Sequence, residues 1–522
     1  MRMPTIALFR ITGHCVAALA FTLPLFGCTS ITDFVHNGFK VGPNYDSLKA
    51  PVAKNWIDAA DKRVRTESDD LSKWWTVFND PVLDSLICSA YRQNLSLRQA
   101  GFQIMTARAQ RNIAVGNLFP QTQQATGDYT RNAISRETAN TQLLGRQYYP
   151  QADLGFNLSW ELDFWGRYRR AVESAEATLD ASVDNYDAVL VTLLGDVATA
   201  YVQIRTIEAQ IKFTQANVDI QRETLKIAKA RFKGGTTTEL DVDQAQSNLS
   251  QTESQIPQLK IQLRQNYTQL CTLLGIPPED LLPRLGAADI PSAPVDVAVG
   301  IPAELLRRRP DVRRAERQAA AQSAQIGLAE ADFYPHISFV GTLGWSAEHL
   351  DHFFRPTAFE GSFGPSFQWN ILNYGRILNN VRGQDAQFKA LVAGYQNTVL
   401  TAGQEVENGL VTFLESQGQA KYLAESVKAA EKAVTVALAQ YGGGMVDFNR
   451  VALVEQNLVT QQNLLAQAQG NIGLGLIQVY RALGGGWQIR CTDCDSKGSA
   501  VGPLSPATDP SRPQFGIPSV AH

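Results

Sequence analysis

The chain has 522 residues, enough for two or three ordinary domains, and a formal net charge of −3 at pH 7. This near balance of acids and bases gives no indication of a nucleic-acid partner. No segment reaches the roughly 18–20 unbroken apolar residues of a membrane-spanning helix. Nucleic-acid-binding proteins and helical membrane proteins are therefore excluded.

Residues 1–27 are predicted to be an export signal. Arg2 and Arg10 give a basic start, and residues 16–23 form a short apolar core before a break at Cys28. Such a signal directs the rest of the chain out of the cytoplasm.

The break itself, Leu25-Phe26-Gly27-Cys28, resembles the lipobox of bacterial lipoproteins, in which the cysteine becomes the lipidated first residue. The alternative is plain signal cleavage near this point. By the same resemblance, Thr29 favours sorting to the outer membrane. Residues 28–72 are then expected to be an N-terminal, lipid-anchored segment.

Two cysteines, Cys88 and Cys271, lie in helical patterns and are predicted to be buried thiols. Cys491 and Cys494 have the C-x-x-C spacing. One such pair, with no second pair and no histidine nearby, is a weak metal or redox signal. A local disulfide is favoured there, and its formation stays open.

A first structural repeat is predicted over residues 73–275. A helix begins near Trp74-Trp75, and a second helical run covers residues 94–118 before Pro120 ends it. Beyond that proline a β-hairpin is expected at about residues 121–164, because the side chains alternate between apolar and polar. The apolar set of its second strand is Leu154, Phe156, Leu158, Trp160, Leu162 and Phe164.

A long helix is predicted next, from Gly166 to Gly234. Apolar residues recur in it every seven positions, at Leu190, Val197, Ile204, Ile211, Val218, Leu225 and Phe232. A period of seven is typical of helices that supercoil against their neighbours. A return helix is expected over residues 239–274, so the repeat ends in a long helical hairpin.

A second repeat, residues 310–487, matches the first at an offset of 209 residues. Its sevenfold positions are Val399, Val406, Phe413, Ala420, Val427, Val434 and Tyr441. A β-hairpin is expected at about residues 336–372, and a return helix at about residues 448–483. The offset favours an internal duplication.

Two stretches lack such patterns. Residues 276–309 are rich in proline and are predicted to be a linker between the repeats. Residues 488–522 form a tail rich in proline, serine and glycine, which is expected to be disordered.

Each chain thus supplies four strands with one apolar and one polar face, as in the wall of a membrane barrel. Four strands cannot close a barrel, and open sheet edges are not tolerated in lipid. Eight strands from a dimer would enclose only side chains, whereas a larger barrel can hold water. A homotrimer with twelve strands is therefore expected if the protein is a conduit.

Together these features resemble the outer-membrane factor lipoproteins of tripartite efflux systems, the relatives of the channel TolC. The similarity covers the chain from Cys28 to about Trp487. It is carried by the lipobox and by the segments 41–43, 74–75, 94–120, 160–167, 231–246, 309–313 and 482–487.

The resemblance implies an α+β membrane protein in which a trimeric twelve-stranded barrel continues into a long periplasmic α-helical barrel. It also implies a bacterial outer-membrane location, a periplasmic adaptor and an inner-membrane pump as partners, and passive export of small molecules such as drugs. Protein secretion of type I and metal efflux remain alternatives.

No enzyme site is predicted. The closest approach to a catalytic pair is Glu161 with Asp163, two residues apart on a polar strand face, where they are expected to line the passage. His336, beside a proline at the start of a strand, is interpreted as a barrel residue. Neither cofactor nor metal is expected.

The gate of the conduit is expected at the tips of the helical hairpins. The turns hold Gly234, Gly235, Gly442, Gly443 and Gly444, since glycine permits the reversal of the chain. By resemblance these glycine tips meet the adaptor.

The charged residues just past the turns are Asp241, Asp243, Arg450 and Glu455, and they are gate candidates or ordinary solvated helix ends. Many relatives form a ring of aspartates at the entrance. Leu453 occupies that position in this chain, so an apolar ring is expected in its place.

Two other classes of protein stay open beside the channel. A secreted coiled-coil protein would explain the sevenfold pattern but not the alternating strands. A periplasmic adaptor would need only one helical hairpin and no internal duplication.

Overall fold

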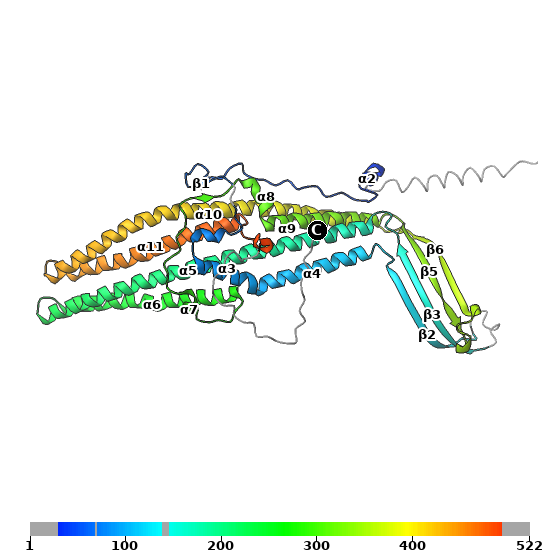
Figure 1. Ribbon diagram of the computed structural model, residues 1–522, viewed down its shortest axis with the longest axis horizontal. Coiled ribbons are helices and arrows are strands. Elements are labelled where there is room, and N and C mark those ends of the chain that lie inside the picture. The colour runs from blue at the N-terminus through cyan, green and yellow to red at the C-terminus, as the bar shows by residue number, and fades with distance from the viewer. Residues whose placement is uncertain (1–29, 68–69, 138–145, 493–522) are drawn as a thin grey trace, which may run out of the picture.

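The computed structural model describes residues 30–67, 70–137 and 146–492. The predicted signal peptide, Cys28 and most of the predicted tail lie outside these residues. Within them, a long bundle of helices carries a tilted sheet at one end (Figure 1). The helix tips lie at the opposite end, so the two expected functional regions are far apart.

One sheet has four antiparallel strands in the order β2-β3-β5-β6. They are β2 (Thr122–Ala133), β3 (Tyr148–Glu161), β5 (His336–Ala347) and β6 (Phe359–Gln368). Large apolar side chains of one face stay exposed in the single chain: Phe156, Leu343, Phe363 and Phe367. This is the alternation expected of a wall with lipid on one side.

The predicted end of β3 is wrong in detail. The strand starts at Tyr148 and stops at Glu161. Asp163 instead accepts hydrogen bonds from the backbone N–H groups of Tyr168 (2.8 Å) and Arg169 (3.0 Å). A carboxylate there satisfies unpaired donors of the first helical turn, so Asp163 starts the following helix and does not line the passage.

The long helices confirm the duplication. Helix α5 (Arg167–Lys233) and helix α10 (Arg376–Gly442) each have 67 residues and span about 100 Å at ~1.5 Å per residue. The return helices are α6 (Glu239–Leu274) and α11 (Phe448–Ala482). Adding 209 to the first and last residue numbers of α5 gives those of α10. Adding 209 to the first residue number of α6 gives that of α11.

Shorter helices precede each hairpin: α3 (Pro81–Gln93) and α4 (Leu95–Gly116) in the first half, and α9 (Pro310–Ala331) in the second. The segment at Trp74–Phe78 is a 3-10 turn rather than the start of the helix. Asn79 ends that turn, and Asp80 then caps α3 by accepting hydrogen bonds from Val82 N (2.9 Å) and Leu83 N (3.2 Å).

The sevenfold positions form the core between the helices. Leu190, Val197, Ile204, Val218, Val406, Phe413 and Tyr441 are fully buried. Phe232, the last position of the first run, is 44% exposed because it lies at the helix tip. Helix α5 is the one described helix apolar and long enough to span a membrane, and 67% of its most apolar window is buried in the chain.

The region expected to be a linker is ordered. It contains α7 (Leu282–Leu285), β4 (Val297–Ala298), the 3-10 turn η4 (Pro302–Glu304) and α8 (Leu305–Arg308). Its apolar side chains, among them Leu281 and Val299, are buried against the helices. Proline prevents a long helix there but does not prevent packing.

The N-terminal segment runs along the outside of the helices (Figure 1). After α2 (Ile31–His36), buried Arg170 of α5 donates to the carbonyls of Val41 (3.0 Å) and Gly42 (2.8 Å). Farther along, β1 (Val64–Arg65) pairs in parallel with β4. This N-terminal strap marks the outer face of the helical bundle.

Two predictions for the cysteines are wrong. Cys88 is disulfide-bonded, whereas Cys271 is a buried free thiol as expected. Cys491 is a free, exposed thiol in the short helix α12 (Ile489–Thr492), so it forms no disulfide with Cys494, which lies outside the described residues.

We expect Arg205→Ala to destabilise the fold strongly. The fully buried guanidinium donates to the carbonyls of Leu285 (2.7 Å) and Gly286 (2.7 Å) and pairs with Glu208 (2.9 Å). Its loss leaves buried acceptors without donors and should lower the free energy of unfolding by about 3–5 kcal/mol.

Denaturant unfolding of the purified protein, followed by circular dichroism, measures this change. The matched control is Arg222→Ala, since Arg222 is half-exposed and its ion pairs with Asp219 and Glu253 lie on the surface. That change should cost less than about 1 kcal/mol. Equal losses in the two variants would contradict the role given to Arg205.

Candidate gate at the helix tips

Glycine makes both tip turns possible. Gly235 has φ +68° and Gly444 has φ +78°, a left-handed conformation that side chains disfavour. In each turn a backbone N–H donates to the carbonyl five residues earlier, from Thr236 to Arg231 (3.0 Å) and from Met445 to Gln440 (2.8 Å). These bonds satisfy the last carbonyls of each long helix.

The other predicted tip glycines lie within the same turns. Gly234 and Gly443 cap α5 and α10, and Gly442 is the last residue of α10. Asp447 then caps α11 by accepting a hydrogen bond from Arg450 N (3.1 Å). The two tips are thus built alike.

A cluster of side chains joins the first tip to the second. The Arg231 guanidinium lies 4.5 Å from the centre of the Tyr441 ring, donates to the Tyr441 carbonyl and reaches the Thr236 carbonyl (3.3 Å). The Tyr441 hydroxyl in turn lies 3.5 Å from Asp241. We call Arg231, Thr236, Asp241 and Tyr441 the tip cluster.

Burial raises the pKa of the Tyr441 hydroxyl, and the nearby Asp241 carboxylate adds to this effect. Tyr441 therefore stays neutral and can donate to Asp241. A cation–aromatic contact of this kind contributes roughly 0.5–2 kcal/mol. The tip cluster holds the two hairpins together at the end where the conduit is expected to open.

The five gate candidates from the sequence lie in different surroundings. Asp243 and Arg450 are exposed, and Leu453 is 60% exposed. Asp241 is half-buried in the tip cluster. Glu455 is only 2% exposed, so the expectation that it is a charged group at an open helix end is wrong.

Glu455 joins three helices. Its carboxylate accepts hydrogen bonds from Thr224 of α5 (2.6 Å) and Asn248 of α6 (3.1 Å). Burial raises its pKa, and the two hydrogen bonds offset part of the rise. Two helical turns farther along α11, buried Gln462 accepts from Asn217 of α5 (2.7 Å). These polar contacts lie within a seam between the two hairpins that is otherwise packed with apolar side chains.

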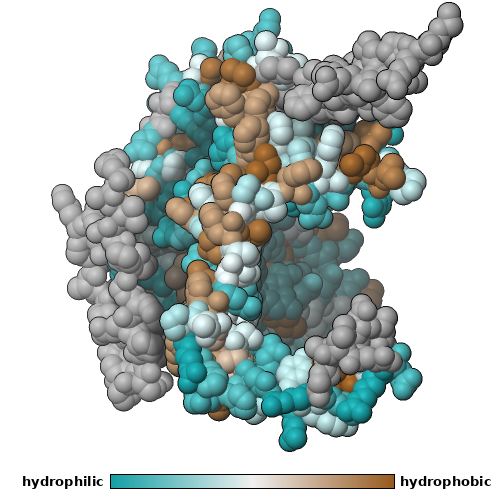
Figure 2. Space-filling model, turned by 90° about the vertical axis from the view of Figure 1, so that its right-hand side faces the viewer, coloured by the Kyte–Doolittle hydropathy of each residue, from teal (hydrophilic) through white to brown (hydrophobic). Residues whose placement is uncertain are grey.

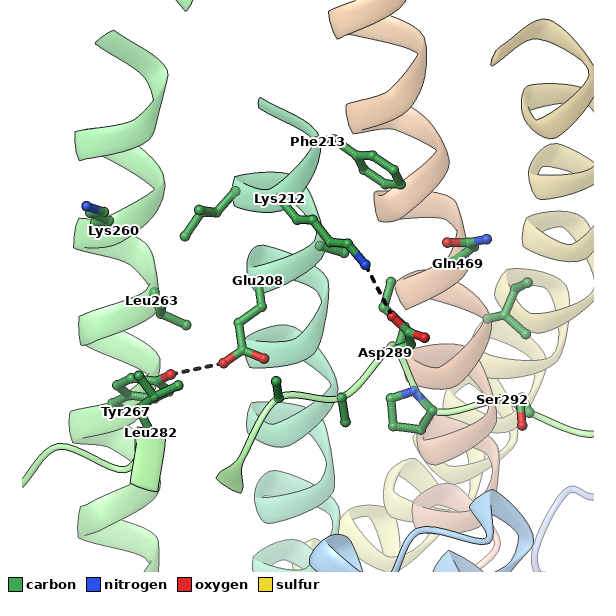
Figure 3. A pocket seen from close by; sticks show the side chains of 18 of the residues that line it. Glu208, Lys212, Phe213, Lys260, Leu263, Tyr267, Leu282, Asp289, Ser292 and Gln469 are labelled. Atoms are coloured by element: carbon green, nitrogen blue, oxygen red, sulfur yellow. Dashed lines mark hydrogen bonds and ion pairs between the residues drawn. The ribbon is translucent and has the colours of Figure 1, made fainter. Parts of the chain in front are cut away.

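A large groove lies on the outer side of the bundle, where the segment after α7 crosses α5 and α6 (Figure 3). Its volume is about 1400 Å³. Tyr267 donates to Glu208 across it (3.0 Å), and Lys212 lies 3.9 Å from Asp289. Its lining combines apolar side chains with charges of both signs and holds no nucleophile–base pair.

At the other end of the bundle, His336 lies 2.7 Å from Glu161, which also accepts from the Tyr168 hydroxyl (2.9 Å). Arg167 approaches the same carboxylate at 3.6 Å. These contacts bind the sheet to the start of α5. In the described part of the chain, no group of three His, Cys, Asp or Glu side chains could hold a metal ion.

The family model for outer membrane efflux proteins matches this chain twice, over residues 86–276 and 301–485. The chain belongs to the outer membrane efflux protein family. Two matches in one chain agree with the duplication seen in α5 and α10.

Among curated proteins, the solvent efflux pump outer membrane protein SrpC of Pseudomonas putida is 30% identical over 90% of this chain and 98% of its own length. Nodulation protein T of Rhizobium leguminosarum bv. trifolii is 30% identical over 86% of this chain and 93% of its own.

Among solved structures, the outer-membrane channel OprN is similar with a TM-score of 0.79 and 32% identity, over 86% of this chain and 99% of that one. The Campylobacter jejuni channel CmeC has a TM-score of 0.80 at 22% identity, which supports the fold alone. The expected fold is therefore confirmed: a protomer of a trimeric outer-membrane barrel continued by a helical barrel. The chain is an efflux channel of the outer membrane.

The sequence did not predict the contact between Arg231 and Tyr441. Tyr441 is the last position of the second sevenfold run, and Arg231 stands directly before the last position of the first run. The sequence also did not predict the contacts of Thr224 and Asn248 with Glu455. The sequence signal for these contacts was a polar residue at a helix position that the pattern predicts to be buried.

We expect Glu455→Gln to stabilise the closed channel at neutral pH. A raised carboxyl pKa means that ionisation opposes folding, so stability falls as pH rises from the ordinary value of about 4.3 through the raised one. A glutamine keeps a donor and an acceptor beside Thr224 and Asn248 without the charge.

Melting temperatures of the purified channel at pH 5 and pH 8 test this prediction. The wild type should lose stability at the higher pH, and Glu455→Gln should lose less. Glu253→Gln is the control, because that carboxylate is 39% exposed and pairs with Arg222 on the surface. A wild-type difference that Glu455→Gln leaves unchanged would contradict the assignment.

Proposed function

We propose that three copies of this chain form a passive exit duct that receives small molecules from a periplasmic adaptor and an inner-membrane pump. The observation that supports this most is the four-stranded sheet, whose outer strands β2 and β6 each have an unpaired edge. Pairing β2 of one copy with β6 of the next gives every strand a partner and closes a water-filled barrel.

The tips, with Gly234, Gly235, Gly442, Gly443 and Gly444, are proposed to meet the adaptor, because they lie farthest from the sheet (Figure 1). Cys28 is proposed as the lipid anchor at the other end, before the strap. The similarity to a solvent efflux pump component favours small apolar or amphipathic cargo. Protein secretion and metal efflux stay as alternatives.

Leu453 is proposed to narrow the entrance. It is exposed on α11. A spacing of seven residues connects Leu453 to Thr460, Gln467 and Leu474, so these side chains lie on one face of the helix. The last two line a hollow on the inner face of the bundle. Leu453 thus points to the same side, where three copies would form an apolar ring that excludes water.

Conductance in a planar bilayer tests both the conduit and this ring. The purified channel should insert and conduct weakly, and Leu453→Ala should raise its conductance severalfold because the apolar ring is lost. Leu400→Ala is the control, since Leu400 is also an exposed leucine but lies on α10, far from the tip turn that ends this helix. Absence of any conductance would contradict the duct, and an unchanged value would exclude Leu453 as the constriction.

Arg231→Ala should also open the channel, by a different route. The change removes the contact that joins the first tip to Tyr441, so the two hairpins separate more easily. We expect longer or more frequent open events with little change in melting temperature.

Lys226→Ala is the control for this change, because Lys226 is an exposed cation one and a half turns away that pairs only with Glu223 within its own helix. Equal gating in Arg231→Ala and the wild type would show that the tip cluster does not hold the gate closed.

A further inference from the structure

Amide side chains gather in a hollow between α5, α6 and α11. The hollow has a volume of about 790 Å³, and ten of its fifteen lining residues are Gln or Asn. They are Gln203, Gln210, Gln255, Gln258, Gln262, Gln265, Asn266, Asn463, Gln467 and Asn471. We call these ten residues the amide wall.

The amide wall lies on the inner face of the bundle. Seen from the sheet end, the chain is hollowed on one side, and the recess is mostly hydrophilic (Figure 2). The groove of Figure 3 lies on the other side of α5 and α6. The strap adjoins it, because β1 pairs with β4 just after the groove residue Val295.

Helix α5 gives independent support for this direction. Its residues Ser174, Thr178 and Asn185 line a second hollow, about 610 Å³, nearer the sheet. Asn185 and Gln203 are 18 residues apart, which is five turns of an α-helix, so they share one face. One side of α5 thus faces the interior along most of its length.

None of the fifteen lining residues of the amide wall hollow carries a charge. The outer groove, built partly from the same helices, includes Glu208, Lys212, Lys260, Arg264, Asp280 and Asp289. Asp196, seven residues before Gln203 on α5, lies on the same helix face as the hollow. It pairs with Arg481 at 2.8 Å, so that pair adds no net charge. Charge is therefore sorted by face along this stretch, whereas nearer the sheet Arg314 lines the second hollow and donates to Asn185 (2.7 Å).

The amide groups are also left to water. Within the described residues, the wall makes only one side-chain hydrogen bond to the chain, from Asn266 to the Gln262 carbonyl (2.9 Å) in its own helix. Buried amides in a packed interface would be paired with one another, as Asn217 and Gln462 are. Asn463 differs, because its side-chain oxygen is buried without a partner among the described residues. The free donors and acceptors of the other amides point to a hydrated surface.

From this sorting we infer that the amide wall is an uncharged section of the conduit, in which solutes of either charge are hydrated alike. The inference rests on the proposed function and describes how this part of the duct treats the charge of its cargo. Rings of acidic or basic side chains concentrate ions of one sign, whereas amides donate and accept without net charge. This section would then admit anionic, cationic and neutral cargo, and leave discrimination to Leu453 and the pump.

Thiol labelling measures the local potential. The variant Gln262→Cys, in a Cys491→Ser background, is treated with a cationic and an anionic methanethiosulfonate of similar size. The ratio of the two rates is divided by the ratio for a free thiol in solution. We expect a value within about threefold of one, since no fixed charge lines the site.

A second variant shows that the assay responds to charge. Adding Gln265→Glu one turn away, on all three copies, should shift the ratio towards the cationic reagent by about fivefold or more. A preference above about tenfold without that change would overturn the inference. So would a Gln262→Cys thiol that reacts with neither reagent, because the face would then be dry.

Position is tested with a polyethylene-glycol maleimide too wide for the duct. It should label Gln469→Cys, on the outer groove, and spare Gln262→Cys. Equal labelling would place the amide wall outside the conduit and overturn the inference. Conductance of the same samples is recorded separately, so loss of the duct function is distinguished from a charged or misplaced wall.

Discussion

The backbone N–H and C=O groups along the outer edges of β2 and β6 impose the constraint on which the rest of the structure depends. In the described part of the chain these edges have no partner strand, and hydrocarbon supplies no substitute for water. Satisfying them requires neighbouring copies, and each strand leads directly into a helix, α4 before β2 and α10 after β6. Closing the sheet therefore also closes the ring of helices below it.

The helices carry this closure over about 100 Å at ~1.5 Å per residue. Within the second hairpin, apolar side chains such as Val434 and Leu458 pack together. Between the hairpins, a shared apolar cluster near the tips is interrupted by the polar contacts of Glu455 and Gln462. The join between the hairpins therefore combines apolar packing with buried hydrogen bonds. The tip cluster adds a contact at the end of that join.

Much of this could be predicted from sequence because it is local. Glycine at positions 166 and 234 set the ends of α5, and alternation of side chains identified the strands. The burial of Glu455 could not be predicted, because periodicity shows which residues share a helix face but not which helix packs against that face. Its partner Thr224 lies 231 residues away in the sequence. The ordered linker was missed for the same reason: Arg205 and Leu285 meet only in the folded chain.

The strap has a mechanical consequence. Arg169 of α5 donates to the backbone carbonyls of Gly38 and Phe39, and Arg170 donates to those of Val41 and Gly42. Tension that enters at the N-terminal end is thus delivered to the first turn of α5, next to the sheet. These bonds lie at the opposite end of α5 from the tips, so a pull on the strap acts first beside the sheet.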